Sequence, residues 1–253
     1  MKNFISIIVP YYKKKKFIKK TLDSIYNQTY KNYEVILIYN DKNLDDLIYI
    51  KNLLKKFKKF SLLISKKEGV ALARNAGIKK SLGNYIAFLD SDDIWKKDKL
   101  EQQISFMNKK NIYVSHTSYK IIGEKDEYIS IRNAKNLNYN QLIRSCDIGL
   151  SSVMIKKNSK INIKFPKIKT KEDYVLWLKI SKLGYKIYAL KKPLTCWRQT
   201  RNSLSSSIIQ KLLDGYRVYR VHENKKSITS LIYLLYLSIN YIKKKFTLWK
   251  KLH

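Results

Sequence analysis

The stretch "ARNAGIKKSLGNYIAFLDSDDIW", residues 73–95, contains the pattern that decides the fold of this chain. Its first half continues a predicted helix that opens at Gly69. Residues 84–90, "NYIAFLD", then form a short apolar run, which is typical of a strand buried on both faces of a sheet. A helix that leads directly into a buried strand is the repeating unit of an α/β protein.

The same unit repeats toward the N-terminus and once more beyond this stretch. Strands are expected at residues 4–10, 33–40, 60–65 and 84–90, and amphipathic helices at 17–28, 44–57, 69–81 and 97–110. Four alternations of strand and helix predict a mostly parallel sheet with helices on both faces. The later order is less regular. Strands are expected at 112–122, 149–157 and 185–190, a helix at 171–184 that ends at Gly184, and helical structure from Ser203 onward.

Polar and aromatic side chains follow three of the first four strands. Ligands of parallel α/β sheets bind outside the carboxyl ends of the strands. Residues 10–12, the pair Asn40 and Asp41, and residues 90–92 stand at such ends. The sequence therefore predicts one crevice lined by these three segments.

Three carboxylates, Asp90, Asp92 and Asp93, crowd one of these strand ends. The chain has 53 Lys plus Arg against 19 Asp plus Glu, a formal charge of +34, so acids are scarce. Two carboxylates one residue apart can face a single Mg²⁺ or Mn²⁺ that takes further ligands from substrate phosphates. The alternative is that Asp92 or Asp93 caps a helix that begins near Trp95.

The basic composition leaves several interpretations open. Only 7 of the 53 basic residues are arginine, the better reader of bases and phosphates, which argues against a nucleic-acid-binding module. A lysine-rich coding bias and attraction to anionic partners both fit the charge. Lysine runs such as 13–16 are expected on solvated faces. An apolar content of 45% predicts a folded globule.

Targeting signals are not apparent in the sequence. Pro10 ends the short N-terminal apolar run, lysines follow where a signal peptide has small residues, and no run reaches the ~18 apolar residues of a membrane span. The two cysteines have no metal-ligand spacing and make no disulfide framework. A cytoplasmic protein is expected.

Five motifs, taken together, resemble the inverting glycosyltransferases of family 2, which have the GT-A fold. They are "SIIVPYY" (6–12), "QTYKNYEVILI" (28–38), the block at 69–95, "KEDYVLWLKIS" (171–181) and "WRQTRNSLS" (197–205). Their order and spacing match the family along roughly residues 3 to 207. The resemblance implies an enzyme that moves a sugar from a nucleoside-diphosphate sugar to a saccharide or lipid-linked saccharide acceptor in surface polysaccharide or lipopolysaccharide synthesis.

The resemblance assigns metal and donor roles. Asp90 and Asp92 would hold a divalent cation, Mn²⁺ or Mg²⁺, that bridges the donor's diphosphate, with Asp92 the more direct ligand and Ser91 beside the donor. Asp93 would cap the following helix. Further donor-binding residues implied by the family pattern are Pro10, Tyr12, Asn40, Asp41, Arg74, Asn75 and Arg198. Arg74 would face a carboxylate or the donor's phosphates, and a structural ion pair is its alternative.

Two positions depart from the family pattern. The family has two aspartates after the second strand, where this chain has Tyr39 and Asn40 and then Asp41. Asn40 or, after a one-residue shift, Asp41 could accept the imide N–H of a uracil, so UDP is the expected nucleotide. A histidine that often helps at the metal or diphosphate in relatives is replaced here by Thr200. Arg198, Arg201 or hydroxyl groups would then have to take over that role.

The helix at 171–184 would supply the base. An inverting transfer needs a group that removes the proton of the attacking acceptor hydroxyl, and the family position corresponds to Asp173. Glu172 would bind the acceptor or support Asp173. The alternative is a helix N-terminal acid favoured by the dipole. Trp177 and Leu178 are expected in the core.

The chain is expected to divide into a catalytic domain, residues 1–205, and a C-terminal helical extension, residues 206–253. The extension has an apolar face followed by Lys243 to Lys245, and two interpretations fit it: an interfacial helix on an anionic membrane, or a helix that packs back on the catalytic domain. Nucleotidyl transfer to sugar phosphates is a second enzyme class that sets acids at the ends of α/β strands.

Overall fold

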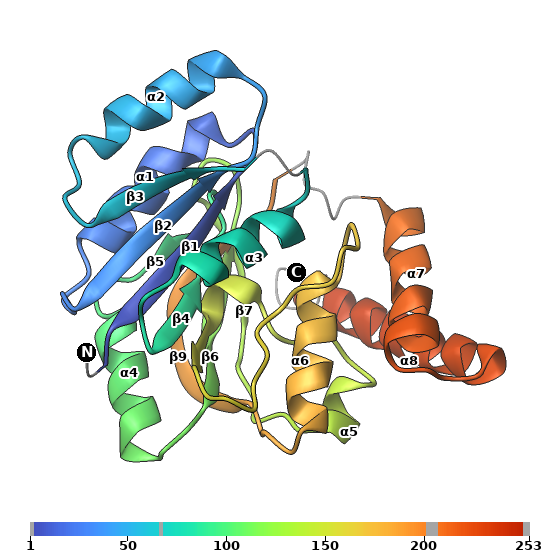
Figure 1. Cartoon of the computed structure of the whole chain (residues 1–253). Coiled ribbons are helices and arrows are strands. Elements are labelled where there is room, and N and C mark those ends of the chain that lie inside the picture. The colour runs from blue at the N-terminus through green and yellow to red at the C-terminus, as the bar shows by residue number, and fades with distance from the viewer. Residues whose placement is uncertain (1–2, 66–67, 201–206, 250–253) are drawn as a thin grey trace.

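The computed structural model describes residues 3–65, 68–200 and 207–249, and in them one nine-stranded sheet forms the centre of the molecule (Figure 1). The strand order is β3-β2-β1-β4-β8-β6-β9-β5, and β7 pairs with β6. The strands are β1 (Ile5–Tyr11), β2 (Tyr33–Tyr39), β3 (Phe60–Ile64), β4 (Tyr85–Phe88), β5 (Ile94–Trp95), β6 (Val114–Ile122), β7 (Tyr128–Arg132), β8 (Val153–Lys156) and β9 (Tyr188–Arg198).

The helices cover both faces of this sheet, as the sequence predicts. They are α1 (Lys15–Tyr26), α2 (Leu44–Leu54), α3 (Val70–Lys80), α4 (Lys99–Lys109), α5 (Tyr139–Leu142), α6 (Glu172–Lys182), α7 (Ile208–Arg217) and α8 (Ser227–Trp249), with a π-helical turn (Val218–His222) between the last two. Side chains alternate across β1: Ile7 and Val9 pack with α1, α2 and α4, whereas Ile8 packs with α3.

The first half of the chain matches the predicted parallel sheet. The pairs β1–β2, β2–β3 and β1–β4 are all parallel, so their carboxyl ends meet at one edge. Helix α3 lies very close to this sheet at Gly77, where an added Cβ would be 2.7 Å from Ile38 Cδ1 and 3.0 Å from Ile8 Cγ2. The close approach fixes the position of Arg74, one turn earlier on the same helix.

The second half mixes strand directions. β8 runs antiparallel to β4 and β6, whereas β6 and β9 are parallel. Residues 94–95 form the short strand β5, paired antiparallel with β9, and α4 begins only at Lys99. The predicted capping role of Asp93 is therefore wrong, because the chain continues from it into a strand and not into a helix.

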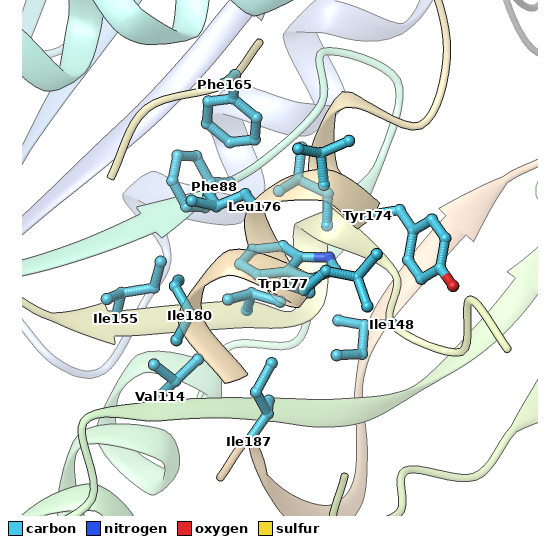
Figure 2. Packing of buried hydrophobic residues seen from close by; sticks show 14 of the residues in the cluster. Phe88, Val114, Ile148, Ile155, Phe165, Tyr174, Leu176, Trp177, Ile180 and Ile187 are labelled. Carbon is cyan, nitrogen blue, oxygen red and sulfur yellow. The ribbon is translucent and has the colours of Figure 1, made fainter. Parts of the chain in front are cut away.

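Helix α6 is the best-buried helix of the fold. Trp177 and Leu178 are fully buried, as predicted, and Figure 2 shows Trp177 surrounded by aliphatic and aromatic side chains of the sheet and neighbouring loops. Gly184 follows the helix with φ +89°, which confirms it as the terminating residue. Because α6 is packed so closely, the residues at its first turn have fixed positions.

The C-terminal helices pack on the rest of the described chain by one face. Val218, Tyr219 and Leu237 belong to the same core as α6, and the Tyr219 and Tyr174 hydroxyls are 3.1 Å apart. In Figure 1, α7 and α8 lie beside α6 on the side away from α1 and α2. Within the described residues no helix has the length and apolar character needed to cross a membrane.

Candidate active site

Arg74 joins two of the predicted site segments. Its Nη2 is 2.6 Å from Asp90 Oδ1, at the end of β4, and its Nη1 is 2.5 Å from Glu172 Oε1, in the first turn of α6. The residue is 4% exposed. Both carboxylates compensate the charge of the buried guanidinium, which such a position requires. The alternative prediction for Arg74, a structural ion pair, thus describes its contacts in this structure.

Asp173 stands beside this ion triad, at the second residue of α6. Its Oδ1 accepts a 2.7 Å hydrogen bond from the backbone N–H of Tyr174. Burial and the neighbouring Glu172 carboxylate raise the pKa of Asp173 to about 7, against the opposing effect of Arg74. A carboxylate with a pKa near neutrality is suited to accept a proton during a reaction.

The loop before α6 is held by α7. Asp214, which is fully buried on α7, accepts hydrogen bonds of 2.9 Å from both the backbone N–H and the hydroxyl of Thr170. Lys171 then adopts a left-handed conformation, φ 64°, which turns the chain into the helix. The position of Asp173 therefore depends on a residue from the C-terminal helices.

Asp92 is paired with a lysine that the sequence analysis placed on a solvated face. Lys14 Nζ lies 2.7 Å from Asp92 Oδ2 and 3.1 Å from Thr200 Oγ1. Burial raises the pKa of Asp92, and Lys14 opposes that effect. Lys14 was missed because it stands in a run of four lysines. The available signal was its place just after the end of the first strand.

Asp93 is fully buried below this pair. Its Oδ1 accepts a 2.7 Å hydrogen bond from the backbone N–H of Arg198, which ties β4 to the end of β9. Burial and the nearby Asp92 and Asp90 carboxylates raise the pKa of Asp93 well above its usual value. Asp93 thus supports the turn that carries the other two aspartates.

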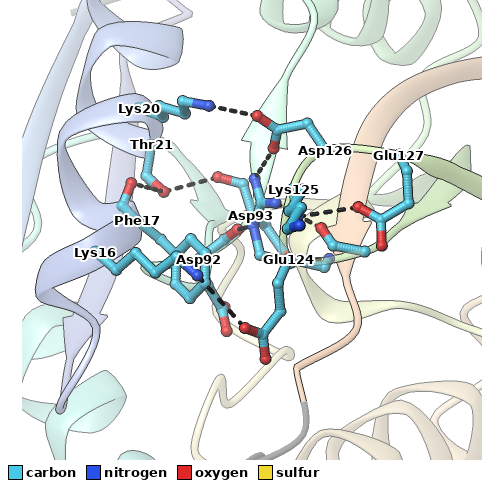
Figure 3. Close-up of polar contacts among 12 residues, drawn as sticks. Lys16, Phe17, Lys20, Thr21, Asp92, Asp93, Glu124, Lys125, Asp126 and Glu127 are labelled. Atoms are coloured by element: carbon cyan, nitrogen blue, oxygen red, sulfur yellow. Dashed lines mark hydrogen bonds and ion pairs between the residues drawn. The ribbon is translucent and has the colours of Figure 1, made fainter.

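The side chain of Arg198 holds the turn between β6 and β7. Its Nε donates to Asp92 O at 2.8 Å, its Nη1 donates to Gly123 O at 2.7 Å, and its Nη2 is 2.5 Å from Asp126 Oδ1. Figure 3 shows α1 facing the same turn, with Lys20 paired to Asp126 and Thr21 bonded to Asp93 O. Arg198 is 3% exposed, so these contacts position Asp92, and its donor-binding role stays a prediction.

The predicted nucleoside pocket lies at the ends of β1 and β2. Pro10 is buried and Tyr12 is 44% exposed, so its ring is accessible to a base. Asn40 Oδ1 accepts from Gly69 N–H at 3.1 Å, and Asp41 Oδ2 accepts from Lys13 N–H at 2.9 Å. Both side chains brace the loops of the pocket, and a carbonyl oxygen with two lone pairs can take a second donor.

The remaining predicted residues are close to the crevice. Asn75 Nδ2 donates to Phe165 O at 2.8 Å, and Asn75 Oδ1 accepts from Phe165 N–H at 2.9 Å. These two bonds hold the segment that leads to α6. Ser91 is buried between Asp90 and Asp92. Arg201, a predicted substitute for the family histidine, lies outside the described residues.

A parallel sheet that ends in an Asp-x-Asp turn, with a carboxylate at the start of a nearby helix, is typical of the class of GT-A glycosyltransferases. The chain belongs to that class at the family level: the model of "Glycosyl transferase family 2" matches residues 6–165. The predicted family, fold class and enzyme class are confirmed.

Known proteins agree with this assignment. The chain is 35% identical over 238 residues to the Escherichia coli UDP-Glc:alpha-D-GlcNAc-diphosphoundecaprenol beta-1,3-glucosyltransferase WfaP, covering 93% of each chain. The fold is similar to TarS of S. aureus in complex with UDP-GlcNAc (TM-score 0.70, 21% identity, 91% of this chain and 69% of that one). It is also similar to the mannosyltransferase PcManGT of Pyrobaculum calidifontis in complex with GDP-Man and Mn²⁺ (TM-score 0.68, 15% identity, 91% and 69%).

Proposed function

We propose that this protein is a metal-dependent, inverting glycosyltransferase that moves a sugar from a UDP-sugar to a saccharide on a lipid diphosphate, in surface polysaccharide or lipopolysaccharide synthesis. The observation that supports it most is the Arg74 bridge, which joins Asp90 in the turn after β4 to Glu172, the residue before Asp173 in the first turn of α6. The E. coli relative WfaP, a glucosyltransferase that acts on GlcNAc-diphosphoundecaprenol, supports the acceptor class.

Asp173 is the residue proposed to accept the proton that the acceptor hydroxyl loses. As the acceptor hydroxyl oxygen forms a bond to the anomeric carbon, Asp173 takes the hydroxyl proton. The bond from the anomeric carbon to the diphosphate breaks, and its electron pair leaves with the nucleoside diphosphate. A base with a pKa near 7 is matched to this step at neutral pH. The acceptor oxygen, on the side of Asp173, attacks the face of the anomeric carbon that is opposite the leaving diphosphate. The configuration of that carbon is therefore inverted.

A divalent cation fits Asp90 and Asp92 only together with the donor. Among the described residues no group of three His, Cys, Asp or Glu side chains is placed to hold an ion by itself. Two carboxylates completed by diphosphate oxygens and water form a typical ligand set of Mg²⁺ or Mn²⁺. When bound, the ion would offset the charge that grows on the leaving diphosphate. The Mn²⁺ complex of PcManGT supports this choice.

A lipid-linked acceptor accounts for the unusual surface of α7 and α8. Of the 21 large hydrophobic side chains exposed in the described residues, 13 lie between Ile208 and Ile242, far more than scattered exposure would place there. The α8 positions 228, 231, 232, 235, 239 and 242 follow one helical stripe. We call these exposed side chains of α7 and α8 the C-terminal apolar face.

The charges around this face favour a membrane over a second copy of the chain. Between residues 207 and 243 the only acids, Asp214 and Glu223, are buried and hydrogen-bonded, so the exposed ionisable groups are basic. The basic groups of two such faces would repel each other. Near anionic lipid, in contrast, each lysine contributes about 1 kcal/mol to the free energy of membrane binding. We therefore propose a cytoplasmic enzyme bound peripherally to the inner face of the cell membrane.

Transfer is tested with a panel of UDP- and GDP-sugars, Mn²⁺ or chelator, and a GlcNAc-diphospholipid acceptor. Product mass and the released nucleotide are measured. A glycosylated lipid with release of nucleoside diphosphate is expected, and only with the metal. Release of pyrophosphate would instead indicate nucleotidyl transfer, and equal rates in chelator would refute the metal role.

Membrane binding is tested by sedimentation with liposomes that contain phosphatidylglycerol or phosphatidylcholine alone. The double variant Leu231→Glu/Leu235→Glu should lose binding to the anionic liposomes, and Leu82→Glu, an equally exposed leucine elsewhere, should keep it. Unchanged binding of the double variant would refute the proposed face, while transfer to a water-soluble acceptor analogue would remain a separate test of the enzyme.

A further inference from the structure

Lys14 links three segments that line the crevice. It precedes α1, just after the end of β1, and its ammonium reaches Asp92 in the turn after β4 and Thr200 after β9. A lysine in the middle of a solvent-exposed basic run is expected to extend its ammonium into water. Here the side chain is 21% exposed and its charge lies between a carboxylate and a hydroxyl.

The two arginines at this edge are already engaged. Arg74 is buried between Asp90 and Glu172, and the guanidinium of Arg198 is directed at the β6–β7 turn and at Asp92 O. A lysine ammonium has three N–H donors. The bonds to Asp92 and Thr200 use two of them, which leaves one for a ligand.

We propose, given the function proposed above, that Lys14 binds the diphosphate of the donor, and that Asp92 and Thr200 hold its ammonium in position before the donor arrives. The donor brings negative charge to an edge that already carries several carboxylates, so a nearby cation is required for binding. An N–H of an ammonium on a phosphate oxygen is a strong, charge-assisted hydrogen bond.

The same contact makes Lys14 a competitor of the divalent cation. Its ammonium is bonded to Asp92 Oδ2, so an ion that reaches this oxygen must displace it. The nucleotide-free protein should then bind Mn²⁺ weakly. Arrival of the diphosphate gives the ammonium another anion to bind and releases Asp92 for the ion.

The first experiment measures UDP and uridine binding by calorimetry in the presence of chelator. Compared with the wild-type protein, Lys14→Met should bind UDP roughly tenfold more weakly, bind uridine equally well, and keep its melting temperature within a few degrees. Lys19→Met is the matched control, because Lys19 lies exposed on α1 and pairs only with Asp23. Lys14→Arg, which keeps the charge, should recover most of the UDP affinity.

Three results would overturn the inference: equal UDP affinity of wild type and Lys14→Met, an equal loss of UDP and uridine affinity, or no binding of UDP by the wild type in chelator when it binds with Mn²⁺. Failure of the wild type to bind any nucleoside diphosphate under either condition would instead refute the proposed function. The two failures are therefore distinguishable.

The second experiment measures Mn²⁺ binding without nucleotide, by electron paramagnetic resonance of the free ion. Lys14→Met should bind Mn²⁺ several-fold more tightly than the wild type, because Asp92 has lost its paired ammonium. Asp92→Asn in the same background should abolish that gain. Equal affinities of the wild type and Lys14→Met would refute the competition.

Discussion

The crevice at the strand ends and the C-terminal apolar face distribute charge in opposite ways. The crevice gathers five carboxylates, and Arg74, Lys14 or backbone N–H groups contact each of them. Between residues 207 and 243 the two acids, Asp214 and Glu223, are buried and hydrogen-bonded, and the charged groups left in water are basic. In a chain of charge +34, every acid of these two regions is thus paired with a cation or hydrogen-bonded.

The strongest test of this contrast is Asp173→Asn. The amide keeps the shape of the carboxylate but cannot accept the proton, so transfer should fall by roughly 10²- to 10⁴-fold. Donor binding should remain nearly intact, because the base acts on the acceptor. Turnover with saturating acceptor and UDP-sugar affinity are measured separately, and a variant that loses affinity but keeps its turnover would show that the role belongs to another residue.

The second test separates the neighbouring aspartates. Asp92→Asn should reduce transfer at least about 10²-fold, by loss of one strong electrostatic stabiliser. Asp93→Asn should cost far less. The raised pKa of Asp93 favours its neutral form, and an amide oxygen can still accept from Arg198 N–H. Comparable losses in the two variants, measured as kcat/KM, would contradict this division of roles.

The third test compares the two sides of α8. Leu237 is buried against the core and Leu235 is 60% exposed. Leu237→Ala should lower the free energy of unfolding by about 2 kcal/mol, whereas Leu235→Ala should change it by less than about 0.5 kcal/mol. Denaturant unfolding gives both values. Equal costs would mean that the exposed stripe is covered in solution.

The last test is a pH dependence. Because burial and Glu172 raise the pKa of Asp173, its basic form is populated above about pH 7 and lost below it. Transfer should therefore fall about tenfold per pH unit between pH 7 and pH 5, and level off above pH 8. A rate that is flat over this range under saturating donor would contradict the assignment of the base.

The early part of the fold could be predicted from the sequence because each of its elements is locally consistent. The strands at 5–11 and 33–39 are apolar on both faces, and their helices have an apolar stripe. β5 and β7 were missed, because strands of two and five residues are too short for their pattern to establish a period. β8, which is antiparallel to both of its neighbours, has an apolar run like those of the parallel strands β1 and β2, so its direction is set by tertiary contacts.

The site was predictable in its residue types and less so in its pairings. The positions of Asp92 and Asp173 follow from motifs, but the pairing of Asp92 with Lys14 and of Glu172 with Arg74 joins segments that are 78 and 98 residues apart in the sequence. Lys14 and Asp214 are the two omissions, because a lysine in a basic run and an acid on a helix have no local signal of burial. Only the folded chain brings them to the turn after β4 and the loop before α6.

The bonds between Thr170 and Asp214 have a consequence for recombining this enzyme with its relatives. A chimera that takes its C-terminal segment from a homologue could be joined in the chain between α6 and α7. Such a junction would separate Asp214 from Thr170 and Tyr219 from Tyr174. A functional chimera should therefore inherit residues 170–222 from one parent, with the crossover placed before this block or after it.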